Sequence, residues 1–247
     1  MTFTSTRFGQ FTYFSTQIGD TNWRGKNVLD FGGNIGNMLR DPNCTIDAER
    51  YWCIDVVRES IERGKEEFPK SHWIFYDHYS FFFNPHGAKQ LELPRTDVLF
   101  DYILAYSVFT NTSRTDMLDL VRQLEGKLAS GGALAFTFID PEYHSWPGRD
   151  PRNNLVWRLE REIYLGNTPP STDVRGLAER AAGAAWFVLV NGKDLYLETE
   201  QIKDYEPREQ VTYHTFYTVD YIKQLFPDAT ILPPANDEMQ HCCVVHG

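Results

Sequence analysis

The chain has 247 residues, of which 42% are hydrophobic, so it can bury a core and is not an intrinsically disordered protein. Lys and Arg number 24 against 34 Asp and Glu, which gives a formal net charge of −10 at pH 7. This acidic balance argues against binding to a nucleic-acid backbone, which depends on a basic surface. We expect a small-molecule or peptide partner instead.

The sequence indicates neither export nor a membrane anchor. Residues 1–14 are rich in threonine and aromatic side chains and lack the charged-then-apolar pattern of a signal peptide. The longest near-apolar run, 181–190, is too short to span a bilayer. We therefore expect a cytoplasmic protein with no membrane partner. Structural thiols, without metal-ligand spacing, are expected at Cys44, Cys53, Cys242 and Cys243.

A glycine-rich turn follows the first expected strand, 28–29, which runs into Asp30. Glycines stand at Gly32, Gly33 and Gly36, where the missing Cβ would allow positive φ and a close approach of backbone N–H groups to a ligand. The turn predicts a loop for a dinucleotide or an adenosine-containing cofactor. A helix-capping turn in any α/β protein is the structural alternative.

Strands and helices alternate between residues 27 and 139. Ser113, with Asp116 three residues later, is typical of a helix start, and Gly131-Gly132 is expected to close that helix. The aromatic residues of 1–26 predict a segment folded over the main domain. This order predicts an α/β, doubly wound, mostly parallel sheet with helices on both faces. The expected strands are 28–29, 51–55, 73–76, 100–106 and 133–139, and the expected helices are 36–40, 57–68 and 113–128.

The pattern changes over residues 141–212, where prolines separate helical pieces from a short hairpin with a turn at 191–192. We expect an α/β insertion after strand five that caps the sheet, with a dimerisation arm as the alternative. The main domain would then comprise 1–140 plus 213–247 and contain seven strands. The later expected elements are helices over 154–164, 173–182 and 218–226, and strands over 186–190, 195–197, 230–232 and 241–245, the last two as antiparallel neighbours.

Ligands of parallel sheets bind at the carboxyl ends of the strands. The residues at these ends are therefore the first site candidates: Asp30, Asp55, Asp77, Ser107 and Asp140.

Taken together, the strand-end motifs resemble those of the class I S-adenosylmethionine-dependent methyltransferases. The resemblance covers about 27–139 and 217–245, and it implies a Rossmann-like methyltransferase fold with S-adenosyl-L-methionine as cofactor. One departure is the long interval between Asp30 and Asp55, which makes Asp47 and Glu49 rivals for the acid of the second strand. Asp55 is favoured because it follows four residues suited to a buried strand. The similar stretches are Val28–Gly36, Ile54-Asp55, Asp77-His78, Phe100–Leu104 with Ser107–Thr110, and Ser130–Leu134.

The resemblance implies a role for each strand end. The Asp55 carboxylate would accept both ribose hydroxyls, and Asp77 would accept from the adenine amine. The glycine loop would hold the methionine end, with Asp30 near its ammonium group. For Asp30 and Asp77 a helix cap is the alternative. The full cofactor set is Tyr13, Asp30, Gly32, Gly33, Asn34, Gly36, Asp55, Val56, Asp77, His78, Tyr106 and Ser107.

Methyl transfer to a hydroxyl or ammonium acceptor needs alignment, exclusion of water and a base. The candidate bases are His144, Tyr143 and His214. His144 comes first because it lies four residues beyond Asp140 and because a histidine titrates near neutral pH. A solvated loop histidine is the alternative.

Two further features of the sequence resemble other enzyme classes but do not support them. Asp140-Pro141-Glu142-Tyr143 resembles the Asp-Pro-Pro-Tyr motif of amino-methylating nucleic-acid enzymes, but it follows strand five rather than strand four. No nucleic-acid partner is therefore expected. A metal-dependent catechol-type site is not expected either, because Ser107 stands where that class has a carboxylate.

We therefore predict a methyltransferase that acts on an oxygen or nitrogen of a small molecule, plausibly in specialised metabolite biosynthesis. The alternatives are a catalytically silent methyltransferase-like binding protein, a peptide methyltransferase and an NAD-dependent oxidoreductase. A homodimer is possible. Three tryptophans of the insertion, Trp146, Trp157 and Trp186, could line an acceptor site or form the insertion's own core.

Overall fold

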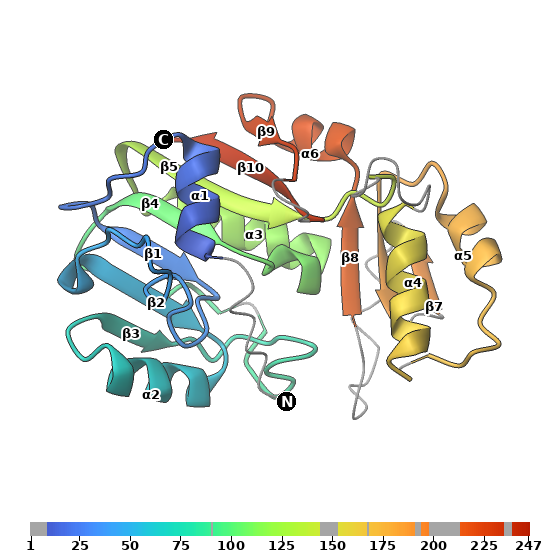
Figure 1. The fold of residues 1–247 in the computed structure, drawn as a ribbon, viewed down its shortest axis with the longest axis horizontal. Helices are drawn as coiled ribbons and strands as arrows, with labels where there is room; N and C mark the ends of the chain where they lie inside the picture. The colour runs from blue at the N-terminus through green and yellow to red at the C-terminus, as the bar shows by residue number, and fades with distance from the viewer. Residues whose placement is uncertain are drawn as a thin grey trace. The chain divides into compact units, whose positions relative to one another are not determined.

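The computed structural model describes residues 9–89, 91–143, 153–166, 168–190, 194–197, 213–234 and 239–247 (Figure 1). They form two compact units. The first comprises the described residues up to Val108 with 119–136 and 244–247, and the second comprises 109–118 and 137–243. In chain order the elements are α1 (Gln10–Ile18), β1 (Val28–Phe31), η1 (Ala48–Arg50), β2 (Tyr51–Asp55), α2 (Arg58–Glu67), β3 (His72–Phe75), β4 (Phe100–Ala105), η2 (Phe109–Asn111), α3 (Arg114–Glu125), β5 (Leu128–Phe138), α4 (Asn154–Tyr164), α5 (Val174–Ala181), β6 (Trp186–Val190), β7 (Asp194–Leu197), β8 (Tyr213–Tyr217), α6 (Val219–Leu225), β9 (Thr230–Leu232) and β10 (His241–His246).

The main sheet has seven strands, the predicted number, and their order is β3-β2-β1-β4-β5-β10-β9. The pairs β1–β2, β1–β4, β2–β3 and β4–β5 are parallel. All four residues of β1 are buried, which fits the central strand of a sheet covered on both faces. The N–H of Gly247 donates to the carbonyl oxygen of Gly132 at 2.9 Å, so the end of β10 lies beside the first half of β5 and these two strands are antiparallel.

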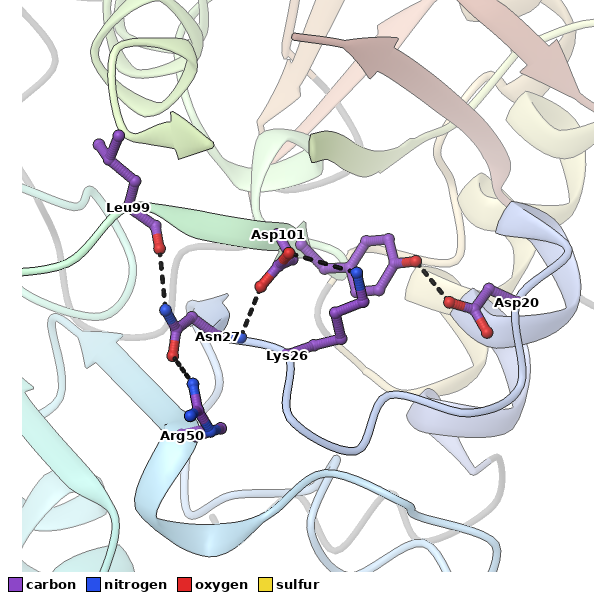
Figure 2. A network of polar contacts seen from close by, with 7 residues as sticks. Asp20, Lys26, Asn27, Arg50, Leu99 and Asp101 are labelled. Atoms are coloured by element: carbon purple, nitrogen blue, oxygen red, sulfur yellow. Dashed lines mark hydrogen bonds and ion pairs between the residues drawn. The ribbon is translucent and has the colours of Figure 1, made fainter. Parts of the chain in front are cut away.

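Polar side chains fix the edge of the sheet at which the parallel strands begin (Figure 2). Asp101 accepts from the Asn27 N–H at 2.8 Å and from Lys26 Nζ at 3.4 Å. The Asn27 side chain donates to the carbonyl oxygen of Leu99 at 3.2 Å and accepts from Arg50 at 3.0 Å. These contacts hold the starts of β1, β2 and β4 in register, so the strands end together at the opposite edge.

The N-terminal segment folds onto the first unit, as predicted, and contains a helix that the sequence analysis did not predict. Figure 1 shows α1 in front of the sheet, and its Tyr13 and Phe14 rings pack against Tyr106, which follows β4. Phe11, Phe14 and Trp23 are fully buried, and the Trp23 ring lies 4.5 Å from that of Tyr102. The Tyr102 hydroxyl donates to Asp20 at 2.6 Å, which ties the segment to β4.

Two predictions around glycines were wrong. The helix expected over 36–40 is a series of turns, because Gly36 has a φ of +81° and leaves the helical region. The helix expected to reach residue 128 ends at Glu125, and Gly131-Gly132 lies inside β5 rather than closing the helix. Gly131, with a φ of +73°, lies in a stretch where the β4–β5 register shifts.

The insertion forms a second sheet with the order β7-β6-β8. The predicted hairpin is confirmed as the antiparallel pair β6–β7, and its turn, 191–193, lies outside the described residues. Strand β8, which the sequence analysis placed in the main domain without predicting a strand, pairs antiparallel with β6. Leu155 and Leu159 of α4 and Leu177 of α5 pack with strand residues Phe187, Leu189 and Phe216 in one buried cluster.

Candidate functional site

The glycine turn at the end of β1 is constrained by its neighbours. Gly32 has a φ of +75°, and its N–H donates to the carbonyl oxygen of Ile54 at 2.7 Å. A Cβ at Gly32 would lie 2.5 Å from a methyl group of Val108. A Cβ at Gly33 would lie 2.5 Å from the carboxyl group of Asp30. Both positions therefore require glycine, for backbone conformation at the first and for space at both.

Asp55, the last residue of β2, holds the turn from the neighbouring strand. One carboxylate oxygen accepts from the Asn34 N–H at 2.8 Å and the other from the Val57 N–H at 2.8 Å. Asn34 has a φ of +54°, and its side chain accepts from the Ser60 hydroxyl at 2.6 Å. Burial raises the pKa of Asp55, while these N–H groups lower it. Backbone N–H groups thus hold the carboxylate in one orientation.

The register of β2 also decides between the rival acids. Asp55 pairs with Phe75 of β3 at the carboxyl end of the strand. Asp47 and Glu49, in contrast, lie before β2, at the edge where the strands begin. The predicted choice of Asp55 as the acid at the strand end is confirmed.

Asp30 lies beneath the turn rather than at its surface. Its side chain is 1% exposed, and it accepts from the Tyr51 hydroxyl at 2.6 Å. Burial raises the pKa of Asp30 to about 7, the Tyr51 hydrogen bond opposes this rise, and the charge of Asp55 adds to it. The carboxyl therefore lies in the interior, where Tyr51 contacts it. Its direct contact with a cofactor stays a prediction.

The end of β3 presents one exposed and one buried polar residue. Asp77 is exposed and accepts from the Asn84 side chain at 3.0 Å. His78 is 7% exposed, and its Nδ1 lies 2.8 Å from the carbonyl oxygen of Tyr79. Its ring stacks on Tyr76 at 5.1 Å. An exposed carboxylate beside a flat buried ring suits a ligand with a donor amine and an aromatic ring.

The end of β4 meets α1. The ring of Tyr13 packs edge-on against Tyr106 at 5.5 Å, and Phe14 does so at 6.1 Å. Ser107 has a φ of +58°, an uncommon backbone conformation that is often found at functional sites. Of the other predicted cofactor residues, Val56 is half-buried after Asp55, and Gly36 is buried.

The three candidate bases differ in what the structure shows. His144 lies outside the described residues. Tyr143 packs edge-on against His241, with ring centroids 5.0 Å apart. The Nε2 of His214 lies 3.5 Å from Glu162, which is buried in α4. Burial and the charge of Arg158 lower the pKa of His214 to about 4, against the opposing effect of Glu162.

The sequence analysis missed several residues that shape this site. Tyr51 and Ser60 have no motif that predicts a polar role, since each acts through a contact with a residue more than 20 positions away. Val108 leaves no space for a side chain at Gly32, and this effect depends on packing alone. No group of three or more His, Cys, Asp or Glu side chains able to hold a metal occurs within the described ranges. In the same ranges no helix is long and apolar enough to cross a membrane.

Comparisons with known proteins give a match at the level of structure. No family model matches the sequence, and no curated protein matches it. An S-adenosylmethionine-dependent methyltransferase from Clostridium acetobutylicum is 13% identical, with a TM-score of 0.52, over 97% of this chain and 90% of that one. An S-adenosylmethionine-bound amino pentose methyltransferase from Micromonospora echinaspora, involved in calicheamicin biosynthesis, is 14% identical, with a TM-score of 0.51, over 96% and 88%. The glycopeptide N-methyltransferase MtfA, complexed with sinefungin, is 9% identical, with a TM-score of 0.53, over 96% and 85%.

This chain has the class I methyltransferase fold.

The resemblance stated from the strand-end motifs is confirmed for the fold. In this methyltransferase fold the carboxyl ends of β1, β2, β3 and β4 carry Asp30, Asp55, Asp77 and Ser107, in the positions predicted from the sequence. The roles of these residues toward a ligand depend on the proposal that follows.

Proposed function

We propose that this chain is an S-adenosylmethionine-dependent methyltransferase that acts on an oxygen or nitrogen atom of a small molecule. The observation that carries this proposal is the Asp55 carboxylate. Its oxygens accept from the Asn34 and Val57 N–H groups at the strand end beside the glycine turn, and a carboxylate can accept more hydrogen bonds than these. Two neighbouring acceptors suit the two vicinal hydroxyls of a ribose.

The surrounding residues fit the rest of the cofactor. Gly32 and Gly33 keep the backbone of the turn open, because a side chain at either would collide with its neighbours. Asp77, exposed at the end of β3, would accept from the adenine amine, and the buried His78 ring would flank the base. Tyr13 would cover the methionine end from α1. When bound, S-adenosylmethionine supplies an activated methyl group on its sulfonium, so the protein has to align the acceptor, exclude water and take a proton.

A small-molecule acceptor is supported by charge and by the insertion. The formal charge of −10 disfavours a polyanionic substrate. We infer that residues 141–212 cap the site and contribute most acceptor contacts, because ligands at strand ends otherwise stay open to water. Two structural neighbours are an amino pentose methyltransferase involved in calicheamicin biosynthesis and a glycopeptide N-methyltransferase. A role in specialised metabolism follows as part of the proposal.

His144 stays the first candidate for the base, with Tyr143 beside it to orient the acceptor. His214 is the weaker candidate. It lies on the face of β8 that packs against α4, next to Glu162, and a pKa of about 4 makes it a poor proton acceptor near neutral pH.

The experiment that tests this function is a melting curve with S-adenosylhomocysteine, the demethylated cofactor. A ligand that binds only the native state raises the melting temperature by mass action. We expect S-adenosylhomocysteine to raise it and NAD to leave it unchanged. A rise with NAD and none with S-adenosylhomocysteine would contradict the proposal and favour an oxidoreductase.

A further inference from the structure

Strand β8 has two faces with different chemistry. Register with β6 places His214 and Phe216 on the face that packs against the helices, opposite Leu189 and Phe187. Tyr213, Thr215 and Tyr217 alternate with them and share the other face, where they are 3%, 0% and 0% exposed. This second face is therefore buried as well, although three of its side chains carry hydroxyl groups.

The second face of β8 contacts the segment that continues from the end of β4. The Thr215 hydroxyl donates to the carbonyl oxygen of Thr112 at 2.6 Å, and β8 packs against η2, which directly precedes Thr112. Residues 109–118 belong to the same compact unit as β8. The segment that follows β4 in the chain therefore supplies the contacts to this polar face.

Two hydroxyl groups in this region are buried without a hydrogen-bond partner. They are the Oγ1 of Thr112 and the Oη of Tyr217. The Tyr217 side chain is fully buried, so solvent does not satisfy its hydroxyl. Buried polar groups in native proteins are nearly always paired, because an unpaired one is destabilising. Two unpaired hydroxyls in one compact unit therefore point to a ligand that pairs with them.

A cation, Arg114, lies in the same compact unit and is held by Tyr221, whose ring stacks on that of Tyr217. Arg114, the first residue of α3, donates through Nε to the Tyr221 hydroxyl, and its Cζ lies 5.7 Å from the ring centres of Trp186 and Tyr221. The rings of Tyr221 and Tyr217 are nearly parallel, at 8°, with centroids 6.5 Å apart. Trp186 is the register partner of Tyr217 across the β6–β8 pair.

The terminal nitrogens of Arg114 are available for a ligand. Among the described residues neither Nη atom donates a hydrogen bond. The Asp116 carboxylate accepts from the Ser113 hydroxyl at 2.7 Å, and the Asp116 N–H donates to the same hydroxyl at 3.0 Å. The guanidinium is thus fixed by one nitrogen and two aromatic rings, with its other two nitrogens open. A planar guanidinium of this kind matches the two oxygens of a carboxylate.

We propose that Arg114, Tyr217 and Thr112 bind a carboxylate group of the methyl acceptor. The two Nη atoms of Arg114 pair with the carboxylate, and the hydroxyls of Tyr217 and Thr112 donate to it. This assignment rests on the proposed function and names the acceptor class, a small molecule that carries a carboxylate. A local cation is needed for such an acceptor because the chain as a whole carries a formal charge of −10.

Calorimetric titration with matched probes tests this assignment. The probes are benzoate and phenylacetate, each compared with its amide, which has the same shape and no charge. We expect the carboxylates to bind at least about tenfold more tightly than the amides, because hydrogen bonds to charged groups are worth that much. Arg114→Gln should remove this preference and leave the affinity for S-adenosylhomocysteine unchanged.

Tyr217→Phe separates a binding role from a structural one. The change removes a hydroxyl that has no partner, so the melting temperature of the unliganded protein should stay equal or rise. The affinity for the carboxylates should nevertheless fall by about tenfold. A lower melting temperature with unchanged carboxylate affinity would assign the hydroxyl to the fold and overturn the proposal, as would equal binding of acids and amides by the wild type.

The two proposals fail separately in these measurements. If S-adenosylhomocysteine binds and no carboxylate is preferred, the acceptor assignment is wrong and the methyltransferase function stands. If the carboxylates bind through Arg114 and S-adenosylhomocysteine does not bind, the proposed function is wrong and the carboxylate site remains.

Discussion

The buried carboxyl of Asp30 makes a quantitative prediction about stability and pH. Its pKa is raised from 3.8 to about 7, so the folded protein holds a proton that the unfolded chain releases. The contribution of Asp30 to stability is therefore fully present below the unfolded pKa and is lost as the pH rises through about 7. A shift of this size corresponds to about 4 kcal/mol between pH 4 and pH 8.

Asp30→Asn removes the titration while keeping an oxygen that can accept from Tyr51. We expect the free energy of unfolding of Asp30→Asn, relative to the wild type, to rise by about 4 kcal/mol from pH 4 to pH 8. The assay is equilibrium unfolding in urea, followed by circular dichroism at a series of pH values. The difference in the free energy of unfolding between the two proteins is measured at each pH, so that the contributions of other titrating groups cancel.

Tyr51→Phe provides the second arm of this test. The Tyr51 hydroxyl stabilises the charged form of Asp30, so its removal should raise the folded-state pKa of Asp30 further and extend the loss of stability to a higher pH. If the difference between the wild type and Asp30→Asn does not change between pH 4 and pH 8, the carboxyl does not lie buried beneath the turn, and the reasoning is refuted.

Three further predictions concern other positions. The pKa of His214 is lowered to about 4, so the free energy of unfolding of the wild type should fall by about 3 kcal/mol as the pH falls from 6.5 to 4. Urea unfolding of His214→Leu should lack this loss. Gly33→Ala places a Cβ 2.5 Å from the fixed carboxyl of Asp30 and should lower the free energy of unfolding by about 1–3 kcal/mol, whereas Gly126→Ala, whose nearest contact would be 3.4 Å away, should change it by less than about 0.5 kcal/mol. His144→Ala should lower turnover by about 10²-fold with unchanged S-adenosylhomocysteine affinity; unchanged turnover in His144→Ala with a loss in His214→Ala would exchange their roles.

Much of the cofactor edge could be predicted because its residues follow strands in the sequence. An acid that follows a strand lies at the sheet edge, and this reasoning located Asp55 at the end of β2 and Asp77 just after β3. The glycine turn was predictable for the same reason, since Gly32 and Gly33 follow β1 directly. These predictions needed only local periodicity and chain order.

The features that could not be predicted depend on contacts between residues far apart in the sequence or on backbone conformation. Tyr51 pairs in register with Val28, and only this pairing brings its hydroxyl beneath the turn to Asp30. Strand β8 has hydroxyl groups on one face and mixes His214 with Phe216 on the other, so its sequence lacks the simple alternation of a half-exposed strand. The prediction of a helix at 36–40 was wrong because the sequence does not distinguish a glycine with positive φ, as at Gly36, from a glycine inside a helix.

The central claim is that Asp55 holds the ribose of an adenosine-containing cofactor, and calorimetric titration of S-adenosylhomocysteine tests it most directly. Asp101 provides a matched control, because it also accepts a backbone N–H but lies at the edge where the strands begin (Figure 2). We predict that Asp55→Ala abolishes measurable binding and that Asp101→Ala binds with wild-type affinity, although each loses a backbone hydrogen bond. Equal affinities in Asp55→Ala and the wild type would contradict the account.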